Sequence, residues 1–211
     1  TESLVTFDLT FVGDPDASVG ILTSPALARL ERHDGVLSPI TFWRWVQGPP
    51  RPLRHLAFSH FDLVEGRLAE QQEEALCAAP GLPDLESLAI RQRLGPGNQS
   101  TWLLESALGR RLKTLEVYAP FDSLHTWIRP LEDSGIQTFV LSAFGGKWAW
   151  TLSRSNDGAF ALELRVDDPR VFGLAPTTFT ARDLALQALE GVPEASFSQV
   201  TTRLPDSDDS P

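Results

Sequence analysis

The chain has little or none of three residue types: cysteine, lysine and methionine. Cys77 is the only cysteine among 211 residues, which excludes an intramolecular disulfide and a zinc site built from cysteines. Lys113 and Lys147 are the only lysines, so almost all of the basic side chains are arginines. Methionine is absent, and we therefore expect the chain to have been processed or excised from something longer.

Long apolar runs are also lacking. No stretch reaches the roughly 18 consecutive apolar residues that indicate a transmembrane helix, and no signal-peptide pattern opens the sequence. The net charge of -10 argues against nucleic acids and anionic membranes as partners. A hydrophobic content of 42% and a charged content of 22% are ordinary for a folded domain. We expect a globular, cytoplasmic protein with no nucleic-acid or membrane partner.

A short apolar pattern, L-x-x-L-x-L, occurs four times. The units begin at Leu53, Leu85, Leu112 and Ile136, at intervals of 32, 27 and 24 residues. Each unit predicts a short strand, and helical patterns separate the units, as over residues 66–78. A strand followed by a helix at this period resembles the leucine-rich repeats, in particular the irregular ribonuclease-inhibitor type.

The resemblance implies an α/β fold, a short irregular solenoid in which neighbouring repeats stack and capping elements cover the ends. Four side chains should then form one buried column on adjacent parallel strands: Leu56, Leu88, Leu115 and Phe139. The chain departs from the family at the positions where the repeats carry Asn or Cys, which here hold Phe61, Arg93, Pro120 and Phe144. A compact α+β domain with a mixed sheet is the alternative, because any buried parallel strand can produce the same pattern.

The flanking segments predict a division of the chain into four regions. Strands are expected at 4–11, 40–46 and 196–202, and a β-hairpin at 147–152 and 160–166. Helices are expected after Ser24-Pro25, after Ser100, after Asp122 and over 180–190. The regions are an N-terminal cap (1–52), the repeats (53–145), a C-terminal hairpin and helix cap (146–204) and a disordered tail (205–211).

Catalytic and metal-binding motifs are not evident. The sequence has no H-E-x-x-H, G-x-S-x-G or P-loop pattern. The pair His60 and Asp62 has a spacing that could hold a metal, but an exposed loop explains it as well. We therefore predict no catalytic residue, no metal and no cofactor.

Strand alternation provides the candidate binding residues, because side chains between the buried positions face the opposite side of the sheet. The resemblance implies that this concave sheet face binds a partner. The predicted partner-binding residues are His55, Ser59, Ser87, Arg91, Thr114, Glu116, Tyr118, Thr138 and Ser142. We expect a non-catalytic protein–protein interaction module whose partner is another protein. Two alternatives are a domain or accessory subunit of a larger multiprotein assembly and an enzyme with a dispersed site.

Overall fold

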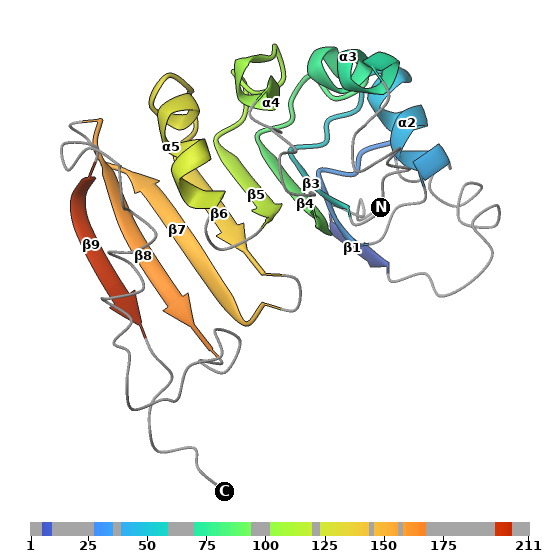
Figure 1. Ribbon diagram of the computed structural model, residues 1–211. Helices are drawn as coiled ribbons and strands as arrows, with labels where there is room; N and C mark the ends of the chain where they lie inside the picture. The colour runs from blue at the N-terminus through green and yellow to red at the C-terminus, as the bar shows by residue number, and fades with distance from the viewer. Residues whose placement is uncertain are drawn as a thin grey trace, which may run out of the picture.

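The computed structural model describes residues 6–9, 28–35, 39–58, 70–93, 102–119, 123–143, 146–155, 158–167 and 197–203. Their strands form one open nine-stranded sheet whose spatial order follows the chain from β1 to β9 (Figure 1). The first six are parallel: β1 (Thr6–Leu9), β2 (Arg32–Gly35), β3 (His55–Phe58), β4 (Ser87–Arg93), β5 (Thr114–Tyr118) and β6 (Thr138–Ser142). The sheet is therefore mainly parallel, as expected for an α/β fold.

The sheet becomes mixed after β6. Strand β7 (Trp148–Arg154) is antiparallel to β6, and β8 (Phe160–Val166) is antiparallel to β7. This confirms the predicted hairpin. Strand β9 (Phe197–Arg203), close to the predicted 196–202, then pairs parallel with β8.

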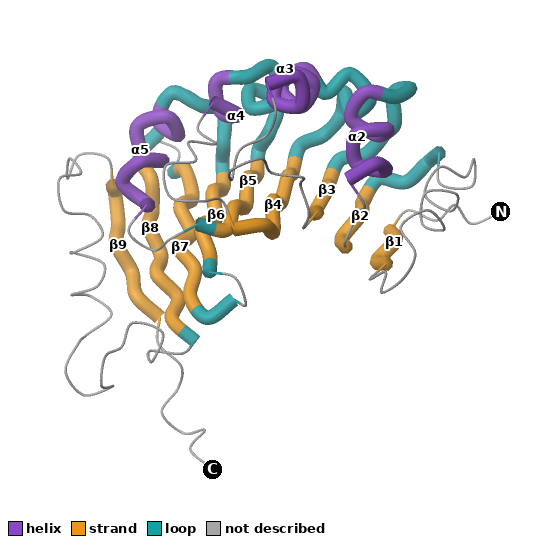
Figure 2. The backbone as a smooth tube through the Cα atoms, turned by 45° about the vertical axis from the view of Figure 1, so that its right-hand side comes forward, coloured by secondary structure: helices purple, strands orange, loops and turns teal. Residues whose placement is uncertain are grey.

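The described helices lie along one face of the sheet: α2 (Pro39–Gln47), α3 (Glu70–Ala78), α4 (Trp102–Glu105) and α5 (Leu124–Glu132). Figure 2 shows the strands in an arc beneath them. We call the opposite side of the sheet, which carries Arg32, His55, Ser87, Thr114 and Thr138, the open face. None of the described helices is long and apolar enough to cross a membrane.

The helix-facing side of the sheet is the core, and it contains the predicted column. Leu56 pairs with Leu88, Leu88 with Leu115, and Leu115 with Phe139, all on adjacent parallel strands. All four side chains are completely buried. The prediction of one buried column on four parallel strands is confirmed.

A backbone contact repeats at the point where the chain enters successive strands. The carbonyl of Glu31 accepts hydrogen bonds from the backbone N–H groups of Arg54 and His55. The carbonyls of Arg54, Glu86 and Lys113 accept the equivalent pairs from the next unit along the chain. Each unit is therefore joined to its neighbour in the same way, although the units differ in length.

The first of these units was not predicted. Strand β2 follows the buried Leu30 and has His33 where the other units have a leucine or phenylalanine. His33 is fully buried and lies edge-on to Trp45, with ring centroids 5.5 Å apart. The parallel run therefore extends into the region predicted to be an N-terminal cap.

The strand predicted over 40–46 is wrong, because these residues belong to helix α2. Their aromatic and β-branched side chains favour a strand by composition. However, the buried positions are Phe42, Trp45 and Val46, a spacing of three and four residues that fits one helix face. Tertiary burial thus outweighs local strand propensity.

Smaller differences concern helix ends. Ser123, not Asp122, precedes α5 as its N-cap, and its side chain makes no capping hydrogen bond. Pro130 lies inside α5 without ending it. Residues 28 and 29 form a turn, and Leu30, which was expected on the apolar face of a helix, is not helical. The predicted helix over 180–190 and the tail 205–211 lie outside the described residues.

Candidate functional site

The strand register brings most of the predicted binding residues together on the open face. His55, Ser87, Thr114 and Thr138 are successive cross-strand neighbours from β3 to β6. Glu116 lies between Ala89 and Val140, and Tyr118 pairs with Ser142 in the same register. Ser142 is buried and offers little surface to a partner. Ser59 lies outside the described residues.

A hydrogen-bonded polar cluster, which we call the His55 cluster, occupies the β2–β4 part of this face. It consists of Arg32, Asp34, His55, Ser87 and Arg91. His55 Nε2 lies 2.7 Å from Asp34 Oδ1, and His55 Nδ1 lies 2.8 Å from Ser87 Oγ. Arg32 Nε donates to Asp34 Oδ2 at 2.6 Å. Asp34, His55 and Ser87 are therefore linked in series across three adjacent strands.

Arg91 lies at the edge of this cluster, with its Nη2 atom 3.9 Å from Asp34 Oδ1. The β4–β5 register shifts between Ile90 and Arg93, so the strand pairing is irregular beside Arg91. The side chain of Arg91 is 39% exposed, so its guanidinium remains accessible to a partner or ligand.

The electrostatics of Asp34 reflect these contacts. Burial works to raise the pKa of Asp34, but hydrogen bonds and charge from His55 and Arg32 outweigh it. The pKa of this carboxyl is therefore held below its ordinary value of 3.8. Asp34 is thus ionised at neutral pH and can orient the imidazole of His55.

The pKa of Tyr118 is shifted by burial and by two other charges on the open face. Burial and the nearby Glu116 carboxylate raise the pKa of the phenol, while the positive charge of Arg91 works to lower it. The phenol remains protonated at neutral pH and can donate a hydrogen bond. Arg91 and Glu116 therefore lie close enough to Tyr118 on the open face for their charges to act on its phenol.

The sequence pattern predicts that His55, Ser87 and Arg91 lie on the open face, but it does not indicate Arg32 and Asp34. These two lie on β2, whose sequence Arg-His-Asp-Gly shows no apolar alternation. The available signal was Leu30, which stands 23 residues before Leu53, a spacing close to the 24 residues between the last two units. That spacing places Asp34 on the same side of the sheet as His55.

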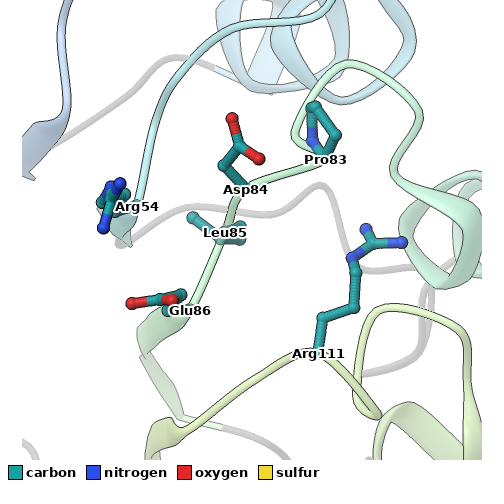
Figure 3. Close-up of a pocket in the computed structure, with 6 residues that line it drawn as sticks. All are labelled: Arg54, Pro83, Asp84, Leu85, Glu86 and Arg111. Carbon is teal, nitrogen blue, oxygen red and sulfur yellow. The ribbon is translucent and has the colours of Figure 1, made fainter.

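A separate polar hollow of about 220 Å³ lies where the chain enters β3 and β4. Figure 3 shows Arg54 and Arg111 on opposite sides of the segment that carries Asp84 and Glu86. Glu86 accepts a hydrogen bond from Lys113 Nζ at 2.7 Å, which lowers its pKa. Because both signs of charge line the hollow, it favours no single class of ion.

Metal ligands do not gather in the described part of the chain, where no group of three or more His, Cys, Asp or Glu side chains could hold an ion. His60 and Asp62 lie outside the described residues. The polar chemistry that the structure does bring together is the His55 cluster.

No family model, curated protein or solved structure matches this chain. The role of the open face is therefore inferred from its own side chains.

The lowered pKa of Asp34 predicts a pH-dependent contribution to stability. This contribution should be complete above pH 3.8 and should disappear as the pH falls through the lower pKa of the folded state, because the unfolded state binds the proton first. Asp34→Asn should therefore be less stable than wild type at pH 7, and the difference should shrink in acid. Urea unfolding of both proteins between about pH 7 and pH 2 measures this. A difference that does not change with pH would show that Asp34 contributes nothing through its charge.

Proposed function

We propose that this chain is a protein-interaction module, built as a short leucine-rich-repeat-like solenoid, that binds another protein through the open face. The solenoid interpretation is supported by the parallel order of β1 to β6 and by the backbone contact that repeats between units. In such an array each unit buries its apolar side against neighbours and helices. The other side of the sheet is left for binding.

The observation that carries this proposal is the grouping of Arg91, Glu116 and Tyr118 on a face that no described helix covers. Arginine and tyrosine are the residue types most often found as energetic anchors of protein interfaces. Ala57 and Ala89, their neighbours on the open face, are small and buried. The longer side chains of Arg91, Glu116 and Tyr118 therefore form the surface there. A mixture of charges suits a protein partner better than the phosphate backbone of a nucleic acid.

Reversing both charges on the open face is expected to weaken partner binding at least tenfold, because each reversed side chain would then face a like charge on the partner. The variant is Arg91→Glu with Glu116→Arg, which keeps the net charge unchanged. The wild-type chain, immobilised, should enrich a partner from a lysate of its source, as measured by quantitative mass spectrometry. The variant should lose that enrichment while its melting temperature stays close to that of wild type.

A matched exchange on the helix side provides the control. Glu74 in α3 and Arg129 in α5 are both exposed, so Glu74→Arg with Arg129→Glu makes the same change away from the open face. This control should retain the partner. If the open-face variant binds the purified partner with unaltered affinity, the open face is not the binding surface.

A further inference from the structure

We propose that Ser87 is an activated nucleophile for which His55 is the general base, and that the open face hydrolyses carboxylic esters. The hydroxyl of Ser87 lies 2.8 Å from His55 Nδ1, and His55 Nε2 lies 2.7 Å from Asp34. A nucleophile within hydrogen-bond reach of a base that a third group orients is the general signature of nucleophilic catalysis. The inference goes beyond the interaction proposed above and does not depend on it.

The fold holds these groups in place through its register. Arg32, His55 and Ser87 are cross-strand neighbours on β2, β3 and β4, at positions where strands lie roughly 4.8 Å apart. Arg32 Nε binds Oδ2 of Asp34 at 2.6 Å, which leaves Oδ1 for the imidazole. The carboxylate is therefore fixed from one side while it orients the base from the other.

The contacts of His55 also assign its neutral tautomer. A proton on Nε2 is donated to the Asp34 carboxylate, so the lone pair on Nδ1 faces the hydroxyl of Ser87 and can accept its proton. The His55 side chain is 19% exposed and that of Asp34 is 21% exposed. The pair is thus shielded enough to strengthen the hydrogen bonds, yet the site remains open to solvent.

Two further groups can stabilise negative charge that develops on a substrate oxygen. Thr114 is the register neighbour of Ser87 on the side away from His55 and carries a hydroxyl donor. The guanidinium of Arg91 lies 3.9 Å from the same Asp34 oxygen that His55 contacts, which puts a positive charge beside the carboxylate that orients the base. Both side chains offer the donors that an oxyanion needs.

The reaction follows from these positions. Ser87 Oγ forms a bond to the carbonyl carbon of the ester as its proton moves to His55 Nδ1. The bond from that carbon to the alcohol oxygen breaks, and His55 returns the proton to the leaving alcohol. Water then attacks the acyl-serine by the same route, which releases the carboxylic acid and restores Ser87.

Covalent labelling tests the proposal without knowledge of the natural ester. A fluorophosphonate reagent should react with the folded chain at Ser87, with formation of an O–P bond and loss of fluoride. Mass spectrometry should locate one adduct per chain on Ser87. Ser87→Ala should abolish it, and His55→Gln or Asp34→Asn should slow it at least tenfold. Ser153→Ala should label like wild type, because Ser153, an exposed serine on the open face in β7, has Thr138 and Ala161 rather than a histidine as its cross-strand neighbours.

A cysteine version separates lost chemistry from lost folding. Cys77→Ser removes the natural thiol, and Ser87→Cys or Ser153→Cys is then added in that background. Iodoacetamide should alkylate Cys at position 87 at least tenfold faster than Cys at position 153, because His55 promotes thiolate formation only at the first. Equal alkylation rates, or a wild-type chain that the fluorophosphonate labels elsewhere or not at all, would overturn the proposal. Such a failure would leave partner binding by Arg91 and Glu116 untouched.

Discussion

Replacing Leu115 with alanine is expected to lower the free energy of unfolding by about 2–5 kcal/mol. Leu115 is completely buried in β5, between Leu88 of β4 and Phe139 of β6. The substitution removes apolar contacts on both sides and leaves a cavity that parallel strands fixed by their hydrogen bonds cannot easily close. Urea denaturation monitored by circular dichroism measures the change.

The matched control lies on the same strand but faces the other way. Glu116→Gln changes the next residue, on the open face, and should alter stability by no more than about 0.5 kcal/mol. The comparison tests the alternation of β5 directly. A loss below about 1 kcal/mol for Leu115→Ala would contradict the burial of the column.

Replacing Arg154 with methionine is expected to lower stability by about 2–4 kcal/mol, because its guanidinium binds several backbone carbonyls at once. Its Nη2 donates to the carbonyls of Leu131 at 2.6 Å and Ser134 at 3.1 Å, and its Nε donates to that of Ile136 at 3.0 Å. These carbonyls lie at or just beyond the C-terminus of α5, where a positive charge also complements the helix dipole. The guanidinium additionally lies over the Phe160 ring, 4.6 Å from its centroid.

Two further variants test whether the loss of stability is specific to the guanidinium of Arg154. Arg165→Met, in β8, removes an arginine whose ion pair with Asp167 is half-exposed, and it should change stability by about 1 kcal/mol or less. Arg154→Lys should recover little of the loss, since one ammonium group cannot reach three carbonyls in fixed directions. Hydrogen exchange should also show weaker protection of the α5 amides in Arg154→Met. Unchanged exchange there would mean that Arg154 does not secure the end of the helix.

The parts of the fold that could be predicted are those in which sequence pattern and burial coincide. Leu56, Leu88 and Leu115 recur at similar spacing because each faces the same layer of helices, so the pattern alone identifies the column. The β7–β8 hairpin was also predictable, since alternation continues on both sides of a turn that contains Gly158 with a φ of 89°.

The sequence misleads at two elements, because the residues present there do not suit the structure that the chain adopts. Strand β2 carries the buried His33 at a position where an apolar residue is expected, so the unit is not recognised. Helix α2 is rich in residues that favour strands, although its buried positions follow a helical period. Because Asp34 lies on the missed strand, the hydrogen-bonded series that includes His55 and Ser87 was missed with it.

Site-specific photo-crosslinking tests most directly whether the open face binds a protein partner. Benzoylphenylalanine in place of Val140, the half-buried cross-strand neighbour of Glu116 on the open face, should crosslink the partner that the wild-type chain enriches. The same group in place of Glu74, which is exposed on the helix side, should not. Crosslinking of that partner from position 74 but not from position 140 would contradict the account, because the helices would then form the binding surface.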